Sequence, residues 1–236
     1  KNYFCVSTDK AANPVNMMGA TKSVMEMYLA QRRHEIKISM ARFANIAFSD
    51  GSLLFGFTKR VRKRQPSVAP HDVQRYFMTP KEAGELCIMS CMFGTDSDIF
   101  IPKTEGGLQP QTFSNMAKRY LRSIGLEPHE CTSEEEARKH AQFIRDDALS
   151  WPCFFSESNT TGEKLLEEFF TNDEILDLET FQTIGIIKNS VKINSKALMI
   201  FEDSLNKIKL SSNWHKNDIL ELFKTLLPDF CHDEKK

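Results

Sequence analysis

The spacing of apolar residues along this chain changes from one segment to the next. Residues 3–8, 36–43 and 98–102 form short, largely apolar runs, which is typical of strands buried in a sheet. Over 19–33 the apolar residues recur at helical spacing, which predicts an amphipathic helix between the first two strands. Because strand–helix–strand order favours right-handed crossovers and a mostly parallel sheet, we expect an α/β fold.

Several helix ends are marked by capping signals. Thr79 can act as an N-cap, Pro80 suits the first helical position, and Glu82 completes a capping box, so a helix should run to about Phe93. Gly125 is placed to end another helix as its C′ glycine. The remaining segments expected to be helical are 53–61, 111–124, 133–147, 164–170 and 216–227, and the segment 66–72, with two prolines, is expected to be a loop.

Composition narrows the class of protein. The chain has 236 residues, enough for one large domain or one domain with a smaller lobe. Its formal net charge of −1 gives no general electrostatic reason to bind nucleic acid or acidic membranes. Since no apolar run reaches the length of a membrane span, we expect a cytoplasmic chain whose own residues make no membrane contact. Attachment through a preceding segment stays open.

The cysteines and histidines give no metal-site pattern. Cys87 and Cys91 share a helix face, but zinc sites usually need closer pairs and more ligands. The histidines show no HxxxH or HExxH spacing. We therefore expect free thiols, as in a reducing cytoplasm, and no metal.

A polar cluster follows the first predicted strand. Thr8, Asp9 and Lys10 come at its carboxyl end, where open parallel sheets bind their ligands. Met18 and Lys22, four residues apart, lie on one face of the next helix. The spacing can aim a hydroxyl, a carboxylate and two amines into one crevice. It is equally compatible with a polar strand end followed by a surface helix.

Several short motifs follow one another along the chain: Thr8-Asp9-Lys10, Asn13-Pro14, Gly19-Ala20-Thr21-Lys22, Arg42-Phe43-Ala44-Asn45, Gly51-Ser52, Arg75-Tyr76-Phe77-Met78-Thr79 and Gly162-Glu163-Lys164. In this order they resemble motifs of the extended short-chain dehydrogenase/reductases. More narrowly, they resemble those of the UDP-N-acetylglucosamine 4,6-dehydratases of bacterial polysaccharide and glycan biosynthesis. The resemblance covers residues 3–170 in outline and is dense over 6–22.

This resemblance implies NAD-dependent conversion of a UDP-N-acetylhexosamine to a 4-keto-6-deoxy sugar. Thr8 would hydrogen-bond the C4 oxygen, Asp9 would protonate the departing C6 hydroxyl, and Lys10 would remove the C5 proton. Lys22 would hold the nicotinamide ribose. For these roles Lys10 has to be neutral and Asp9 protonated when the reaction begins.

Met18 stands where the superfamily usually has tyrosine. Its thioether cannot transfer a proton, so the role of the tyrosine is redistributed or lost. A methionine-bearing subgroup of the 4,6-dehydratases is associated with retention at sugar C5, and the resemblance implies the same outcome here.

Further residues are candidates for binding the nucleotide sugar. By resemblance, Asn45 and Ser52 would contact the diphosphate or the sugar, Arg75 would pair with phosphate oxygens, and Glu163 would accept hydrogen bonds from the uridine ribose. Each of the four could instead be structural.

The family's glycine-rich GxGxxG fingerprint does not occur in the chain, which therefore resembles the C-terminal portion of a longer protein. We assign 1–48 and 72–103 to the second half of an NAD-binding Rossmann domain. Residues 49–71 and 104–170 would form a nucleotide-sugar-binding lobe. Residues 171–236 would be a helical extension, and we expect a homo-oligomer.

Two other functions stay open. A nucleotide-sugar 4-epimerase would not need Asp9 and Lys10, and it usually relies on the tyrosine that Met18 replaces. For this chain alone, the missing glycine fingerprint favours a non-catalytic module that binds only a nucleotide sugar or a partner subunit. The intact Thr8-Asp9-Lys10 motif favours a working enzyme for the full-length protein.

Overall fold

The computed structural model describes residues 2–95, 97–188 and 194–232. Its helices are α1 (Met17–Gln31), α2 (Leu53–Arg62), α3 (Pro80–Phe93), α4 (Phe113–Ser123), α5 (Glu134–Gln142), α6 (Ser195–Leu210) and α7 (Lys216–Leu226). Its longer strands are β1 (Asn2–Thr8), β2 (Lys37–Phe43), β4 (Ser67–Pro70), β7 (Asp98–Pro102), β9 (Glu127–Glu130), β10 (Ser150–Ser156), β11 (Ile175–Asp177) and β12 (Ile184–Lys188). Two-residue strands are β3 (Asn45–Ile46), β5 (Gln74–Arg75), β6 (Phe77–Met78) and β8 (Gln111–Thr112).

The main sheet has the strand order β1-β2-β7-β12-β11. β1 pairs in parallel with β2, and β2 in parallel with β7. β12 runs antiparallel to β7, and β11 antiparallel to β12. The predicted α/β fold and its parallel strands are therefore confirmed, with an antiparallel pair added at one edge.

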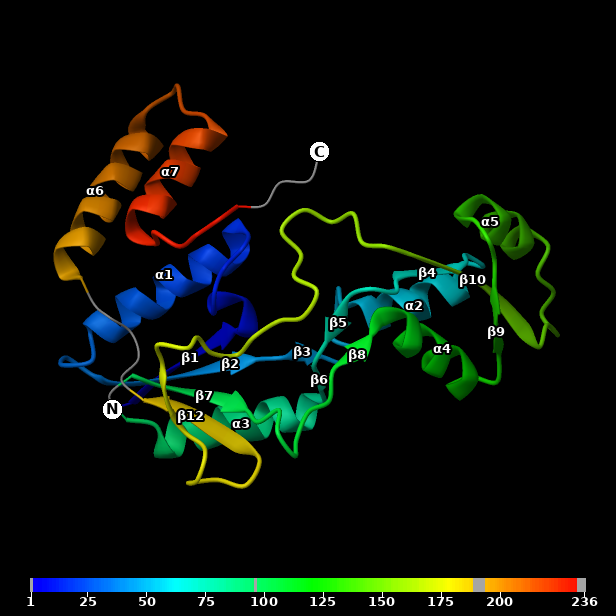
Figure 1. Cartoon of the computed structure of the whole chain (residues 1–236), viewed down its shortest axis with the longest axis horizontal. Helices are drawn as coiled ribbons and strands as arrows, with labels where there is room; N and C mark the ends of the chain where they lie inside the picture. Colours follow the sequence, from blue (N-terminus) through cyan, green and yellow to red (C-terminus); the bar gives the residue numbers. More distant parts are fainter. Residues whose placement is uncertain (1, 96, 189–193, 233–236) are drawn as a thin grey trace.

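Helices cover both faces of this sheet (Figure 1). On one face α3 packs Ala83 and Leu86 against the strand residues Met40 and Ile99. α1 lies on the other face, and the hairpin of α6 and α7 packs over α1 (Figure 1). Among the helices of the described residues, none combines the length and apolar content that a bilayer span requires.

A smaller lobe extends from one end of the sheet (Figure 1). Its strands have the order β4-β10-β9, and both outer strands run parallel to β10. Leu54 and Phe57 of α2 pack with Ala69 of β4 and Ala117 of α4 in a core of their own. The lobe thus has its own hydrophobic cluster beside that of the main sheet.

Two capping predictions are confirmed. Thr79 and Glu82 form the reciprocal capping box at the start of α3. Gly125 has a φ of +82°, the left-handed backbone expected of a C′ glycine after α4.

The predicted loop at 66–72 is wrong, because β4 occupies most of it. Ser67 and Ala69 of β4 are buried and pair with Cys153 and Phe155 of β10. Pro70 is tolerated because β4 is an edge strand and Pro70 is its last residue. The two prolines therefore mark the ends of a strand.

The predicted helix at 164–170 is also wrong. The carbonyl of Leu165 accepts a hydrogen bond from the Gln74 backbone N–H at 2.8 Å, and the carbonyl of Lys164 accepts one from Arg75 Nη1 at 2.9 Å. These carbonyls bond to β5 instead of to their own segment, so the segment is extended.

We expected residues 171–236 to be a helical extension, but the described part of this region contains strands as well as helices. α6 and α7 are helices, but β11 and β12 are strands of the main sheet. Ile186 and Ile187 of β12 are buried against β7, and this burial of β-branched residues favours a strand. The predicted helix at 133–147 begins as expected but ends at Gln142.

Candidate active site

The predicted polar cluster forms a compact turn at the end of β1. Oγ1 of Thr8 donates to Oδ1 of Asp9 at 2.8 Å, and Nζ of Lys10 donates to the same oxygen at 3.0 Å. Asp9 is only 1% exposed. The structure therefore brings a hydroxyl, a carboxylate and an ammonium group within direct contact at the carboxyl end of a parallel strand.

Two glycines allow other segments to approach this turn. A Cβ on Gly19 would lie 2.3 Å from the backbone oxygen of Lys10, so α1 can pass the turn only with glycine there. A Cβ on Gly162, whose φ is +63°, would lie 2.8 Å from Cβ of Asn16. Asn16 caps α1 through the Gly19 N–H at 2.9 Å and donates to the Gly162 carbonyl at 2.7 Å. The segment after Gly162 is thereby fixed beside the turn.

That segment supplies Glu167, a residue that the sequence analysis missed. Oε1 of Glu167 lies 3.6 Å from Nζ of Lys10 and 3.8 Å from Nη2 of Arg75. Nη2 of Arg75 also lies 3.0 Å from Oε1 of Glu163. Positive and negative groups therefore alternate from Asp9 through Lys10, Glu167 and Arg75 to Glu163.

The two acidic groups nearest Lys10 are both buried. Burial raises the pKa of the Glu167 carboxyl, and the charge of Asp9 adds to that rise, while Lys10 and Arg75 oppose it. Oδ2 of Asp9 is buried and has no hydrogen-bond partner among residues 2–95, 97–188 and 194–232. A buried oxygen without a partner is costly and is suited to receive a donor from a bound molecule.

Arg75 is a buried member of this series of alternating charges. Only 3% of it is exposed, and its Nη1 donates to the carbonyls of Gln74 at 2.8 Å and Lys164 at 2.9 Å. The other oxygen of its partner Glu163 accepts from the Ser158 hydroxyl. A phosphate contact for Arg75 and a ribose contact for Glu163 stay predictions, and both side chains already have protein partners.

Met18 and Lys22 lie apart from the turn in the first half of α1. Met18 is 48% exposed, and Nζ of Lys22 lies 4.0 Å from Sδ of Met25. The hydrogen bonds and ion pairs of the described residues do not link either side chain to Asp9 or Lys10. A contact of Lys22 with the nicotinamide ribose stays a prediction.

Asn45 and Ser52 lie at the base of the lobe and bond to their own surroundings. Nδ2 of Asn45 donates to the Tyr76 carbonyl at 3.3 Å. Oγ of Ser52 caps α2 by accepting from the Phe55 N–H at 3.3 Å. Their roles in substrate binding stay predictions.

A sequence profile described as a polysaccharide biosynthesis protein matches residues 1–189. The chain belongs to this polysaccharide biosynthesis protein family. The chain is 36% identical over 191 residues to a probable polysaccharide biosynthesis protein, EpsC, of Bacillus subtilis, which covers 80% of this chain and 28% of EpsC. It spans 61%, 32% and 28% of the lengths of three curated relatives, which is less than two thirds of each.

Solved structures support the fold. Pen from Bacillus thuringiensis superposes with a TM-score of 0.63 at 20% identity, covering 82% of this chain and 54% of Pen. A dTDP-glucose 4,6-dehydratase, DesIV, from Streptomyces venezuelae with NAD and DAU bound superposes with a TM-score of 0.50 at 12% identity, covering 71% of this chain and 50% of DesIV. The resemblance to the extended dehydrogenase/reductase fold is thereby confirmed.

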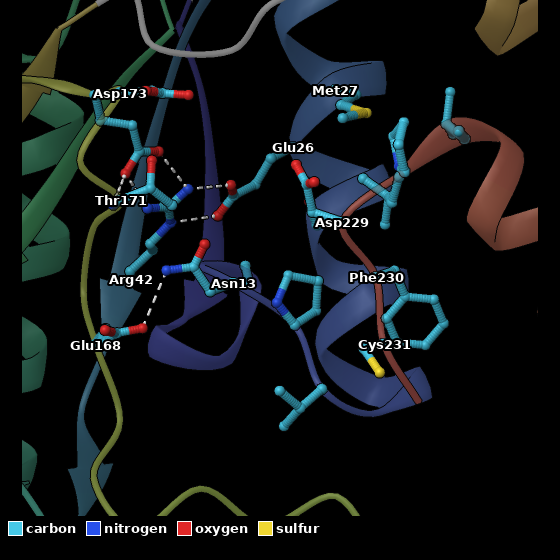
Figure 2. A pocket seen from close by; sticks show the side chains of 18 of the residues that line it. Asn13, Glu26, Met27, Arg42, Glu168, Thr171, Asp173, Asp229, Phe230 and Cys231 are labelled. Carbon is cyan, nitrogen blue, oxygen red and sulfur yellow. Dashed lines mark hydrogen bonds and ion pairs between the residues drawn. The ribbon is translucent and has the colours of Figure 1, made fainter. Parts of the chain in front are cut away.

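A cavity of about 530 Å³ lies behind the turn, between α1 and the C-terminal segment (Figure 2). In it Arg42 pairs with Glu26 at 2.8 Å (Figure 2). Arg42 also pairs with Glu174 at 2.9 Å. These opposite charges hold the pKa of Arg42 above its usual value, although burial opposes them. Asp9 and Lys10 do not line this cavity, so it does not contain the predicted acid and base.

Sequence reasoning missed Glu167 for a structural reason. Because we expected residues 164–170 to be a helix, we could not predict which groups the Glu167 carboxylate contacts. No spacing within 164–170 indicated those groups, because Lys10 and Arg75, which Glu167 contacts, are distant in the sequence.

Proposed function

We propose that this chain provides the acid and base groups of an NAD-dependent enzyme that removes water from a UDP-N-acetylhexosamine. The product would be a 4-keto-6-deoxy sugar for polysaccharide or glycan biosynthesis. The observation that carries the proposal is the contact of 3.0 Å between Lys10 Nζ and the buried Asp9 carboxylate, whose other oxygen has no described partner. Membership of the polysaccharide biosynthesis family and the fold shared with a 4,6-dehydratase support it.

NAD fits this chain only in part. When bound, the cofactor would supply the hydride chemistry at sugar C4 and C6. Lys22 is the residue that would suit the nicotinamide ribose, because within the described part of the chain its ammonium makes a single hydrogen-bond contact, to Sδ of Met25 at 4.0 Å. The chain contains no GxGxxG turn for the pyrophosphate, so we assign none of those contacts to it.

The hydrogen bond of 3.0 Å between Lys10 Nζ and Asp9 Oδ1 provides a path for the proton transfer that prepares both groups for the reaction. Moving one proton from the Lys10 ammonium to the Asp9 carboxylate gives a neutral amine and a carboxylic acid. The amine takes the C5 proton, which a 4-ketone makes acidic, and the acid protonates the C6 hydroxyl, which leaves as water. Lys10 is then an ammonium and Asp9 a carboxylate. As C6 is reduced, the Lys10 ammonium would return a proton to C5 and become a neutral amine again, and the proton lost from the C4 hydroxyl on its oxidation would restore the Asp9 carboxylic acid.

The remaining groups orient these two. Thr8 Oγ1, which donates to Asp9 at 2.8 Å, would turn to the sugar C4 oxygen when substrate binds. Glu167, whose Oε1 lies 3.6 Å from Lys10 Nζ, would position the Lys10 side chain together with Asp9.

Turnover in D₂O tests the assignment, using the complete protein that carries this chain. With UDP-N-acetylglucosamine and NAD, nuclear magnetic resonance should detect a 6-deoxy-4-keto product with solvent deuterium at C5. Lys10→Ala should abolish dehydration with little change in UDP-sugar affinity, because a base acts mainly in the transition state. A C4 epimer without exchange at C5 would show that the enzyme is an epimerase.

The stereochemistry at C5 tests the role of Met18 separately. We expect retention at C5, and Met18→Leu should keep most of the activity because a thioether carries no proton. Inversion at C5 would remove the stereochemical argument and leave the dehydratase assignment in place.

A further inference from the structure

A cluster of side chains with metal-binding atoms lies at the outer end of the lobe. His129 is on β9, Cys131 follows that strand directly, and His140 is in the last turn of α5. Their ligand atoms all lie within 4.8 Å of one another. Sγ of Cys131 is 3.8 Å from Nδ1 of His140, and the two imidazole rings stack with centroids 5.4 Å apart.

We propose that His129, Cys131 and His140 bind one zinc ion. Two imidazoles and a thiolate suit zinc, whereas magnesium and calcium prefer oxygen ligands. Bond lengths of about 2.0–2.3 Å place the ligand atoms of a tetrahedral zinc site about 3.4–3.6 Å apart. The Cys131–His140 separation of 3.8 Å is already close to that value, and the exposed ring of His129 can move the remaining distance.

Hydrogen bonds around the cluster hold its ligands in place. The backbone N–H of Cys131 donates to the Cys153 carbonyl of β10 at 2.8 Å, which anchors the ligand strand. The Glu136 carboxylate accepts from the backbone N–H and the hydroxyl of Thr132, each at 2.7 Å, which fixes the start of α5 beside Cys131. Bonds of this kind orient metal ligands before the ion arrives.

The charge near the cluster favours a cation. Glu136 and His140 are four residues apart on α5 and share a face. A carboxylate on this face of the helix attracts a divalent cation.

The position of the site indicates a structural role. β9 is an edge strand of the lobe sheet, and α5 follows it in the chain. A zinc ion bound by these three side chains would tie this edge to the helix, and a water molecule would fill the position that a fourth protein ligand takes in most structural sites. β9 and α5 lie at the opposite end of the molecule from β1 and α1, so the ion would take no part at the Lys10 site (Figure 1). The sequence pattern missed the site because its third ligand comes from another element.

Zinc titration of the complete, chelator-treated protein tests the proposal. We expect one zinc per chain with a Kd below about 1 µM. Cobalt should give a thiolate charge-transfer band and the visible spectrum of a tetrahedral ion. Cys131→Ser and His140→Ala should each weaken zinc binding by about a hundredfold or more, since even an outer partner contributes ten- to a hundredfold. Zinc should raise the melting temperature of the wild type and of neither variant.

The matched control removes a histidine and a cysteine elsewhere. The double variant His34→Ala/Cys231→Ser changes two exposed residues outside the cluster and should bind zinc as the wild type does. Metal-free circular dichroism melts show whether each variant folds, and a second cysteine variant, Cys131→Ala, replaces any that does not. Absence of stoichiometric zinc binding, or binding that survives loss of Cys131 and His140, would overturn the proposal.

Discussion

Lys10 and Glu167, far apart in the sequence, meet at the end of β1 with 3.6 Å between Nζ and Oε1. The contact gives Lys10 a second carboxylate besides Asp9, and both carboxylates are buried. Glu167 also lies 3.8 Å from Arg75, so one carboxylate joins the proposed base to the Arg75–Glu163 pair. We therefore treat Glu167 as a positioning residue for Lys10.

Replacing Glu167 should reduce turnover more than substrate affinity. Glu167→Ala removes one side of the Lys10 environment and should lower kcat about ten- to a hundredfold, with KM changed less than about threefold. Glu167→Gln keeps the shape and should restore part of the lost kcat. Steady-state kinetics of the complete enzyme measure both values. A large rise in KM with unchanged kcat would instead place Glu167 in substrate binding.

Glu167 should also make stability depend on pH. Its pKa is raised in the folded chain, chiefly by burial, so the folded state holds the proton more tightly than the unfolded state. The stability from this group is present below the unfolded pKa and is lost as pH rises through the higher folded pKa. Urea denaturation should show the free energy of unfolding of wild type falling relative to Glu167→Gln as pH rises through the acidic range. If the wild type instead became more stable relative to Glu167→Gln as pH rises, the result would contradict the raised pKa of Glu167.

Arg75 should be important for stability whether or not it contacts phosphate. Arg75→Ala leaves Glu163 and Glu167 without their shared cation, and breaking a buried pair in this way costs about 3–5 kcal/mol. Arg122→Ala is the control, because its pair with Glu127 is exposed and should contribute about 1 kcal/mol or less. Denaturant melts compare the two variants. Equal losses would show that the Arg75 cluster is not a stabilising unit.

How much the sequence could predict depends on how local each interaction is. The strand ending at Thr8, the helix carrying Lys22 and the capping box at Thr79 are encoded by neighbouring residues, and all three were predicted. The extended segment with Glu167 was missed because its hydrogen-bond partners lie on β5. β12 was missed for the same reason: its place in the sheet comes from pairing with β7.

Gly19 should be irreplaceable for steric reasons. Any Cβ there would meet the Lys10 carbonyl at 2.3 Å and the Pro14 side chain at 3.2 Å, so the backbone of the catalytic turn or of α1 has to shift. Gly19→Ala should therefore destabilise the fold and reduce dehydration, although alanine is the better helix former. Gly84→Ala is the matched control, since Gly84 also lies in a helix and a Cβ there meets nothing within 4 Å. That substitution should raise the free energy of unfolding by about 0.5–1 kcal/mol and leave activity unchanged. Denaturant melts and turnover assays on both variants test this prediction. If Gly19→Ala and Gly84→Ala changed the free energy of unfolding and the turnover equally, α1 would not be in tight steric contact with the turn.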